Sequence, residues 1–460
     1  MDVLLISPPW IIRKGSFWKG LIANTPSIGL GYLAACLEER GVTVEIIDAS
    51  ARGITLADVR REIEQRAGVA WIGISTTSYQ YRMACEVARA AKQASPSSRV
   101  VMGGVHPTLF PDEVLQNRQV DYVVRHEGEL TLPELVQGAA PEGIAGLSYR
   151  RDGTVVHNSD RPWIENLDDV PLPAFHRMPM DKSRLSLSIA RRTPAMMLIG
   201  SRGCPFKCNF CNTTVMGTKY RFRSAENIVS EIRVLMQRFG IREIHFQDDS
   251  FTLNRDRVMR LCDIIIQENI DISWLCMTHV AAVDQDMLHR MKAAGCHQIC
   301  FGVESGNQGI LRNLNKNTTL DQIRAVVPLM KRAGIDARGS IMVGCPGETE
   351  ETLERTLAFV KEIDLDLITV TIFTPIPGSK IHEWAKTHNL LLTEDWTEYT
   401  GGSAVMRLPG LSPEAVRRWH LRMYRRFYLR PKFIARQLRK IRSAADIMVH
   451  LKMFAKVAHR

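Results

Sequence analysis

Residues 1–140 alternate between short apolar runs and longer stretches with helical spacing. The runs are rich in β-branched residues and end at proline, glycine or polar residues, as strands do. Alternating strands and helices predict an α/β fold, here a Rossmann-like, doubly wound parallel sheet. Such sheets bind ligands at the carboxyl ends of their strands. The predicted strands are VLLIS (3–7), VEIID (44–48), VAWIGIS (69–75), RVVMGG (99–104) and VDYVV (120–124).

Residues 141–190 interrupt this alternation. The segment GLSYRRDGTVVH (146–157) predicts a small hairpin that turns at Asp-Gly. Three prolines then fall between positions 171 and 179, a composition that is typical of a connector. We therefore predict that this linker separates two domains.

Residues 191–400 contain a second series of strand and helix patterns. Six such repeats, without a run of strands alone, predict a (βα)6 partial TIM barrel. Residues 401–460 carry helical spacing and predict a basic helical C-terminal region. The barrel strands are expected at MMLIGS (196–201), EIHFQD (243–248), ISWLCMT (272–278), HQICFGVE (297–304), RGSIMVG (338–344) and LITVTIF (367–373).

The net charge of +11 is concentrated at the C-terminal end. Residues 411–460 hold 14 Lys/Arg against Glu414 and Asp446, and the remaining residues carry a net charge of −1. A neutral body argues against a nucleic-acid groove, so we expect no nucleic-acid partner for it. Three interpretations of the basic end stay open. It is a helix pair packed on the barrel with its arginines outward, an amphipathic segment attracted to anionic lipid, or an RNA-binding segment.

The N-terminus, MDVLLISPPW, lacks the cationic lead and the cleavage site of a secretory signal. No stretch approaches the ~20 consecutive apolar residues that are needed to span a bilayer. We therefore expect a cytoplasmic location, with peripheral attachment to the inner face of the membrane as a further hypothesis for the basic end.

The strongest chemical signal is the loop GSRGCPFKCNFCNT (200–213), which follows the first strand of the second series. Its cysteines Cys204, Cys208 and Cys211 have the spacing C-x3-C-x2-C. Four thiolates would close a zinc site or fill every corner of a [4Fe–4S] cube, whereas three leave one iron open. The alternatives are three packing cysteines, or zinc with a distant fourth ligand. The other seven cysteines stand apart in apolar or helical surroundings, where cysteine commonly packs as a small hydrophobe.

This loop resembles the signature of the radical S-adenosylmethionine (SAM) superfamily, C-x3-C-x-aromatic-C, with Phe210 as the aromatic residue. The resemblance implies a [4Fe–4S] cluster whose open iron binds SAM, and reductive cleavage of SAM to a 5′-deoxyadenosyl radical. It also implies an electron donor of the flavodoxin or ferredoxin type. The SAM contacts that it implies are Asp248 with its neighbour Asp249, Glu304, and the residues Ser340 and Gly344 of GSIMVGCPGET (339–349).

A doubly wound sheet before such a barrel resembles the cobalamin-binding (B12-binding) subclass. The resemblance implies a corrinoid at the strand ends of residues 1–140. No D-x-H-x-x-G motif follows the first strand, and His106 and His126 are the only histidines at the strand ends there. This implies cobalamin without a protein histidine on cobalt, or a degenerate domain without cofactor. The implied cobalamin contacts are Ser75, Thr76, Thr77, Gly103, Gly104 and Glu127.

The combined resemblance implies a cobalamin-dependent radical SAM enzyme that methylates an unactivated carbon or phosphorus of a small-molecule, lipid or tetrapyrrole substrate. A second hypothesis is a cyclase, oxidase or rearrangement enzyme of the anaerobic tetrapyrrole cyclase type, without methyl transfer. A third is a protein that is not an enzyme, namely an iron–sulfur sensor or a binding module. The methylthiotransferases fit poorly, because their front domain supplies three cluster cysteines and this one has Cys36 and Cys85 alone.

Overall fold

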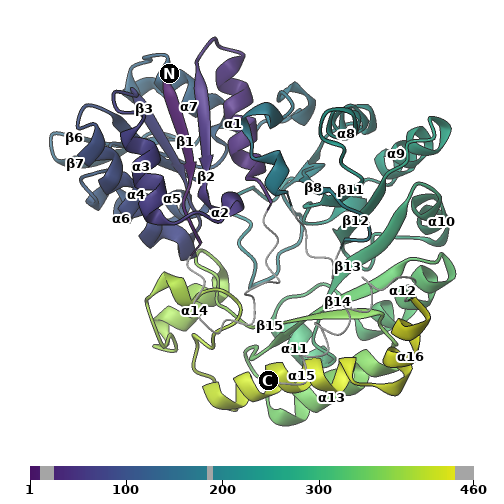
Figure 1. Ribbon diagram of the computed structural model, residues 1–460. Coiled ribbons are helices and arrows are strands. Elements are labelled where there is room, and N and C mark those ends of the chain that lie inside the picture. The colour runs from purple at the N-terminus through teal and green to yellow at the C-terminus, as the bar shows by residue number, and fades with distance from the viewer. Residues whose placement is uncertain (11–24, 184–189, 441–460) are drawn as a thin grey trace.

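The computed structural model describes residues 1–10, 25–183 and 190–440. It contains two large sheets that lie side by side (Figure 1). The first has seven strands in the order β2-β1-β3-β4-β5-β6-β7, and all of its pairings up to β5 are parallel. Its strands are β1 (Val3–Ser7), β2 (Val44–Asp48), β3 (Trp71–Ser75), β4 (Arg99–Gly103), β5 (Tyr122–Val124), β6 (Leu147–Arg151) and β7 (Thr154–His157).

Helices cover both faces of this sheet, which confirms the doubly wound fold. One face packs against α1 and α7, and the other against α3, α4 and α6. The helices are α1 (Ile28–Glu38), α2 (Ala49–Arg52), α3 (Leu56–Glu64), α4 (Tyr81–Ala94), α5 (Val105–Leu109), α6 (Pro111–Gln116) and α7 (Gly128–Val136).

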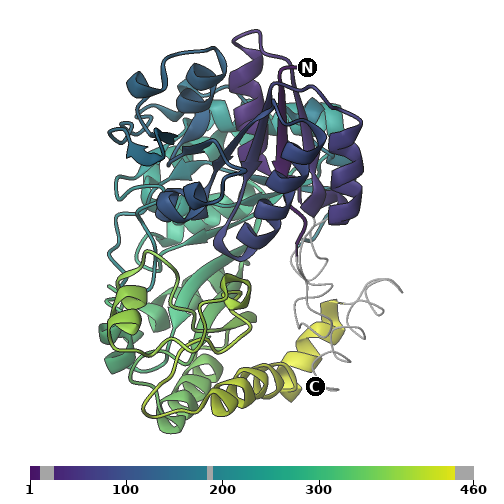
Figure 2. The same cartoon turned by 90° about the vertical axis from the view of Figure 1, so that its left-hand side faces the viewer.

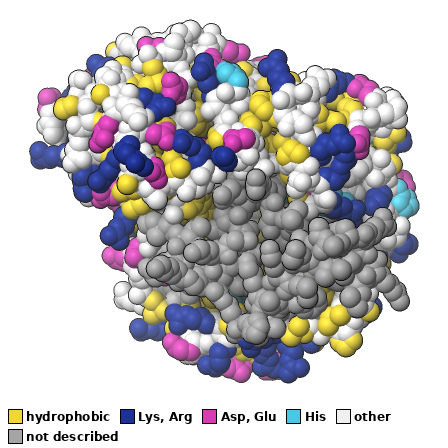
Figure 3. Space-filling model, in the orientation of Figure 1, with side chains coloured by type: hydrophobic (Ala, Val, Ile, Leu, Met, Phe, Trp, Pro, Cys, Tyr) yellow, Lys and Arg dark blue, Asp and Glu magenta, His cyan; other side chains and the backbone are white. Residues whose placement is uncertain are grey.

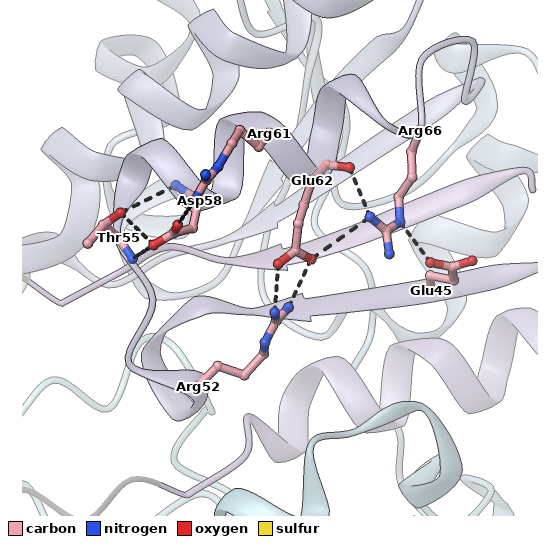
Figure 4. Close-up of polar contacts among 7 residues, drawn as sticks. All are labelled: Glu45, Arg52, Thr55, Asp58, Arg61, Glu62 and Arg66. Carbon is pink, nitrogen blue, oxygen red and sulfur yellow. Dashed lines mark hydrogen bonds and ion pairs between the residues drawn. The ribbon is translucent and has the colours of Figure 1, made fainter.

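Local capping explains where α3 begins. The Thr55 hydroxyl accepts a hydrogen bond from the Asp58 backbone, and the Asp58 carboxylate accepts one from the Thr55 backbone, which forms a capping box (Figure 4). Arg52 also pairs with Glu62 across the turn between α2 and α3, and the shorter of their two contacts is 2.6 Å.

The hairpin at the start of the connector extends the first sheet. The expected hairpin forms, and its strand β6 pairs antiparallel with β5. The hydrophobic side chains Leu147 and Tyr149 favour this position because they are buried in the front-domain core. Single 3₁₀ turns follow in the connector at Leu167–Asp169, Phe175–Arg177 and Met180–Lys182.

The second sheet has six parallel strands in the order β15-β14-β13-β12-β11-β8 and curls into a half-barrel, as the six repeats predict. The strands are β8 (Ala195–Leu198), β11 (Glu243–Phe246), β12 (Ser273–Thr278), β13 (Cys296–Glu304), β14 (Asp336–Val343) and β15 (Leu367–Ile372). The helices between and after them are α8 (Ala225–Phe239), α9 (Arg255–Gln267), α10 (Gln285–Ala293), α11 (Gln308–Asn313), α12 (Leu320–Arg332), α13 (Glu350–Glu362) and α14 (Lys380–Thr387).

Alternation along these strands separates a packed side from a concave side. Residues such as Ile244, Cys276 and Ile341 are fully buried in the core that the outer helices share. Their neighbours in sequence are half-buried and, because side chains alternate along a strand, face the hollow of the half-barrel. This concave set includes Met197, His245, Met277, Cys300, Ser340 and Thr369.

The basic C-terminal region packs on the barrel. Its helices α15 (Pro413–Tyr428) and α16 (Pro431–Lys440) run along the lower side of the molecule (Figures 1 and 2). Trp419, Met423 and Phe427 of α15 are buried in the barrel core, whereas Arg418 and Arg422 are exposed. Of the three interpretations, this geometry favours the packed helix pair with its arginines outward. Residues 441–460 of the basic end lie outside the described residues.

In the part of the chain that the structure describes, we find no helix with the length and apolar character needed to cross a membrane.

Candidate functional site

The three-cysteine loop is closed at its base by a short antiparallel ribbon. Strands β9 (Ser201–Arg202) and β10 (Arg221–Phe222) pair with each other and enclose residues 203–220. Gly203 has a φ of +81°, and a Cβ atom there would overlap the carbonyl oxygen of Lys219, so the tight start of the loop requires glycine. The Cys204 amide donates a hydrogen bond to Gly217 O at 3.3 Å.

Two other loops of the barrel hold this loop in place. The Asn209 amide donates to Leu314 O at 2.9 Å, and the Asn315 side chain donates to Lys207 O at 2.6 Å. On another side, Ile381 at the start of α14 donates to Asn209 O at 3.1 Å. The cysteine loop is therefore fixed by hydrogen bonds to the segment after α11 and to the first turn of α14.

The three cysteines form one electrostatic group. The protein around the sulfur of Cys211 desolvates it although the residue is exposed, and this desolvation, the charge of Asp249 and the other two thiols raise the pKa of Cys211 to about 11. Burial likewise raises the pKa of Cys204 and of Cys208. Lys316 opposes these shifts at all three thiols.

This donor set fits an iron–sulfur cube. Within the described ranges, no three Cys, His, Asp or Glu side chains converge closely enough to hold one metal ion. In a cube each thiolate binds a different iron, so the sulfurs need not gather around a single centre. Three cysteines on one glycine-containing loop therefore suit a cluster better than a zinc ion, which needs four converging ligands.

Glu304 ends β13 beside this loop. Its φ is +59°, and the register between β13 and β14 shifts between Gly302 and Glu304. Lys316 donates to its carboxylate at 3.0 Å and lies 6.0 Å from the ring centre of Phe210. A Cβ atom on Gly302 would overlap the Glu304 carboxylate, so this glycine makes room for the ion pair.

Lys316 is a site residue that sequence reasoning missed. Burial would lower the pKa of this lysine, but Glu304 and the thiols of Cys208 and Cys204 raise it above its ordinary value. A lysine in an asparagine-rich turn (LNKN, 314–317) carries no sequence signal that separates it from a surface residue.

The two aspartates after β11 have different environments. Asp248 is fully buried, accepts hydrogen bonds from the Gly200 amide at 2.7 Å and from the Ser201 hydroxyl, and lies 3.7 Å from Arg257. Asp249 is exposed and acts electrostatically on Cys204 and Cys211. Asp248 is therefore bound to the residues just before the cysteine loop, whereas the charge of Asp249 acts on the thiols.

The two predicted SAM contacts in and after β14, Ser340 and Gly344, have different surroundings. Ser340 is half-buried on the concave side, level with Gly302 and Thr369 in the sheet. Gly344 has a φ of +91° and lies where α15 approaches, since a Cβ atom there would come within 3.1 Å of Val416. Gly344 thus permits helix packing, and its amide donates to Glu348 at 2.7 Å.

A pocket lies at the carboxyl ends of the front strands. It has about 920 Å³ of empty space including its open mouth, and its walls come from both domains. Ser75, Gly103, Gly104 and Glu127 line it, as does His126. Ile199, Arg202 and Met216 contribute the barrel side of the wall.

Three predicted or considered residues lie outside this wall. The Thr76 hydroxyl donates to Thr77 O at 3.0 Å, and the Thr77 hydroxyl donates to Gln80 at 3.1 Å. His106 is fully buried, stacks on Tyr81 with ring centres 4.0 Å apart, and has a pKa that burial lowers to about 3. Its position does not favour a cobalt ligand.

Glycine and aliphatic residues make up much of the pocket wall. Glycines 29, 73, 103, 104 and 128 form part of its wall, and most of the other lining side chains are aliphatic. A Cβ atom on Gly29 would meet nothing within 4 Å, so this residue borders open space. Walls without side chains allow close backbone approach, and aliphatic walls favour the burial of apolar surface.

Comparison with known proteins agrees with both halves of this geometry. The family model for the radical SAM superfamily matches residues 198–360, and the model for the B12 binding domain matches residues 23–136. The chain is 37% identical to an uncharacterized methyltransferase, PH0819, of Pyrococcus horikoshii, with 95% of each chain covered. It is 27% identical to the anaerobic magnesium-protoporphyrin IX monomethyl ester cyclase of Rubrivivax gelatinosus, with 94% of this chain and 78% of the relative covered.

A solved structure has the same fold. The radical SAM methyltransferase TsrM from Kitasatospora setae, solved with cobalamin and a [4Fe–4S] cluster bound, superposes with a TM-score of 0.72 at 18% identity. The match covers 92% of this chain and 91% of that one. The family resemblance that the cysteine loop and the front sheet indicated is thereby confirmed, and with it an enzyme whose family uses a [4Fe–4S] cluster, SAM and cobalamin. The chain belongs to the radical SAM superfamily, in its methyltransferase-like branch with an N-terminal B12-binding domain.

Proposed function

We propose that this enzyme transfers a methyl group to an unactivated carbon or phosphorus of a small-molecule, lipid or tetrapyrrole substrate. The observation that carries the proposal is the adjacency of the two cofactor regions. Arg202 lines the front pocket and stands two residues before Cys204, the first cysteine of the loop. A group held at the pocket mouth and a group held by the loop would therefore share one space between the domains.

When bound, the cluster with SAM would supply a 5′-deoxyadenosyl radical, and the corrinoid would supply a transferable methyl group. For the cluster we propose Cys204, Cys208 and Cys211 as ligands. The backbone contacts of Asn209 to Leu314 and Ile381 keep the ligand loop from opening. Lys316 places a positive charge beside the thiolates, which reduces their mutual repulsion.

For SAM we propose Glu304 and Ser340 as contacts, because Glu304 ends β13 beside the cysteine loop and Ser340 lies on the concave side of β14. Asp249 joins them, since it is exposed and its charge acts on Cys204 and Cys211. Asp248 and Gly344, also predicted as contacts, would act indirectly. Asp248 holds Gly200 and Ser201 at the base of the loop, and Gly344 shapes the turn after β14.

For the corrinoid we propose Ser75, Gly103 and Gly104 as contacts, because all three line the pocket at the strand ends. Thr76 and Thr77 would support this wall, because the Thr76 amide donates to Gly103 O at 3.0 Å. Glu127 borders the same pocket, but every contact that its carboxylate makes with a described residue goes to an arginine or a backbone amide.

The proposal is tested with the full chain, reconstituted without oxygen and incubated with dithionite, SAM and hydroxocobalamin. We expect 5′-deoxyadenosine and S-adenosylhomocysteine to form. Cys204→Ala, Cys208→Ala and Cys211→Ala should each abolish 5′-deoxyadenosine. Cys85→Ala, a half-exposed cysteine of α4 in the front domain, is the matched control and should leave it unchanged.

The products separate the remaining hypotheses. A cyclase-type reaction, which the similarity to the Rubrivivax gelatinosus enzyme keeps open, should give 5′-deoxyadenosine without S-adenosylhomocysteine. A protein that bound SAM without cleaving it would give neither product, and that result would reject the proposal.

We propose an electron donor of the flavodoxin or ferredoxin type, which would approach the outer side of the loop, where Lys207 and Cys211 are exposed.

Attachment to anionic lipid is a proposal for the arginines of α15 alone. Its aromatic side chains are buried in the barrel core and are not free to enter a membrane. Arg418, Arg422 and Arg426 are exposed, and basic side chains gather along the lower edge of the face in Figure 3. Flotation with anionic vesicles, lost in the triple Arg→Gln variant, would support attachment.

A further inference from the structure

We propose that Glu127, Glu129, Arg202 and Arg221, here called the Glu–Arg bridge, couple the front pocket to the cysteine loop. A ligand that fills the pocket would restrict the loop, and a loaded loop would favour the ligand. The coupling to cobalamin rests on the proposed function, whereas the restriction of the loop by the bridge does not.

The bridge joins the two domains through charge-assisted hydrogen bonds. Arg202 donates to Glu127 at 2.8 Å and lies 2.7 Å from Glu129. Arg221 donates to the same Glu127 carboxylate at 2.8 and 3.0 Å. The carboxylates precede and begin α7 of the front domain, and the arginines belong to β9 and β10 of the barrel.

All four groups are removed from water. The side chains of Glu127 and Arg221 are 6% and 1% exposed, and those of Glu129 and Arg202 are 9% and 7% exposed. Two positive and two negative charges balance each other at this site. Removal of one charge would leave another buried without its partner, which is far more costly than the loss of a surface ion pair.

The arginines occupy both ends of the cysteine loop. Arg202 directly precedes Gly203 and Cys204, and Arg221 directly follows the loop. Because one carboxylate holds both arginines, the two ends of the loop are fixed against the front domain at a single point. Arg221 also donates to Met216 O within the loop at 3.1 Å.

The connector reinforces this point. Ile164 donates its amide to Glu127 at 2.9 Å and accepts a hydrogen bond from Arg221 at 2.7 Å. The guanidinium of Arg221 lies 5.1 Å from the ring centre of Trp163, and a Cβ atom on Gly217 would come within 3.0 Å of the same indole. Movement of the loop therefore requires movement of the connector as well.

Three members of the bridge also border the pocket. Glu127, Glu129 and Arg202 line it together with Met216 of the loop. A ligand that packs against these side chains meets the groups that fix the loop. Its affinity must then depend on how well the loop is ordered, and by linkage the order of the loop must depend on the ligand.

The chain offers a matched control pair within the same domain. Arg52 and Glu62 make a bidentate ion pair between α2 and α3, shown in Figure 4. Both residues belong to the front domain, and neither borders the pocket. Glu62→Gln should therefore change the local ion pair without changing the loop.

The first experiment measures the Kd of hydroxocobalamin for the full chain with and without a reconstituted cluster. We expect the cluster to tighten binding at least about fivefold in the parent, the lower end of ordinary coupling. In Glu127→Gln and Arg202→Gln the ratio of the Kd without the cluster to the Kd with the cluster should fall toward one. Arg202→Lys, which keeps the charge, should retain part of it, and Glu62→Gln should retain all of it.

The second experiment needs no corrinoid. Hydrogen exchange of residues 203–220 should accelerate at least about tenfold in Glu127→Gln, and also in Glu129→Gln, which removes the ion pair with Arg202. It should not accelerate in Glu62→Gln. Circular dichroism identifies variants that fail to fold. If Glu127→Gln does not fold, Glu129→Gln takes its place in the experiment.

The two experiments have separate consequences. If hydroxocobalamin fails to bind the parent and loop exchange still accelerates, the cobalamin proposal fails and the role of the bridge in fixing the loop stands. If the parent ratio is one, the coupling is rejected. If neither the ratio nor the exchange rate responds to the bridge variants, the whole inference is overturned.

Discussion

Lys316 lies where three kinds of group meet. It donates to the Glu304 carboxylate at 3.0 Å, lies near the Phe210 ring, and acts on the thiols of Cys204 and Cys208. A buried positive charge beside three cysteines stabilises the thiolate form and any further negative charge that the loop holds. The neighbouring Glu304 needs the same lysine, because its carboxylate is buried as well.

We predict that Lys316→Met makes the cluster harder to reduce. Loss of one positive charge beside the thiols is worth about 1 kcal/mol. This free energy corresponds to a reduction potential that is lower by roughly 40 mV for one electron. Lys316→Arg should shift the potential less, and Lys207→Met, an exposed lysine of the same loop, should shift it little. Spectroelectrochemical titration measures this difference, and equal shifts for Lys316→Met and Lys207→Met would contradict the prediction.

Glu348 is the residue from which we predict a dependence on pH. Burial raises its pKa from 4.5 to about 7, although it accepts hydrogen bonds from the Gly344 and Cys345 amides. Between these pKa values the folded state holds a proton that the unfolded state releases. Stability therefore falls as the pH rises through this window, by on the order of 3 kcal/mol in total.

Glu348→Gln keeps the acceptor oxygen and removes the charge. Its apoprotein should be more stable than the parent at about pH 8, and the difference should shrink toward about pH 5. Thermal unfolding across this range measures it, with the exposed Glu351→Gln as control. A variant whose advantage does not change with pH would rule out this role for the carboxyl.

At the scale of elements, α15 protects the edge of the half-barrel. Strand β15 ends the sheet, and an edge strand exposes backbone groups that need partners. The Tyr428 hydroxyl accepts from the Ile368 amide at 3.0 Å and donates to Ile368 O at 2.7 Å. Tyr424, one helical turn earlier, makes the same pair of bonds with Val370 at 2.9 and 3.1 Å.

We predict that Tyr424→Phe and Tyr428→Phe each destabilise the protein by about 1–3 kcal/mol, because a buried edge amide loses its partner. Tyr399→Phe is the control, since its hydroxyl donates to the loop carbonyl of Thr393 and not to a strand at the sheet edge. Chemical denaturation measures the three variants. A loss for Tyr399→Phe as large as for the other two would show that the edge position does not matter.

At the scale of the whole molecule, the two domains share packed surfaces. Ile28, Tyr32 and Cys36 of α1 are buried in the core of the barrel, while Leu30 and Ala34 of the same helix face the front sheet. A helix that is apolar on all sides must be covered on all sides. A second contact joins the front domain to the segment after α14, where Trp396 stacks on Phe110 with ring centres 5.2 Å apart.

We predict that Trp396→Ala loosens this second contact. The indole also donates to Glu113 at 3.3 Å and lies edge-on to His106, so its loss opens a gap between the domains. The free energy of unfolding should fall by about 2–4 kcal/mol. Hydrogen exchange should become faster near residues 105–116. Trp384→Ala, at an exposed tryptophan, should cost much less. Equal costs would mean that Trp396 does not hold the domains together.

Much of this protein was predictable from local patterns. Alternating runs gave both α/β sheets, because burial on both faces requires apolar β-branched strands between helices. The cysteine spacing identified the loop and, through the family, its cofactors, because three ligands so close in sequence must share one site. The residue contacts to SAM and cobalamin and the boundaries of the domains stay predictions.

Other features depended on contacts between residues far apart in sequence. Spacing alone did not show that Asp248 is buried against Gly200 and Ser201, or that Glu127 pairs with Arg202 and Arg221 of the other domain. The position of Lys316 beside the thiols likewise depends on contacts between residues far apart in sequence. The sequence by itself determined which elements form and which chemistry they carry, since both follow from neighbouring residues. Only the tertiary structure decided which charged groups meet, because that depends on how separate elements pack.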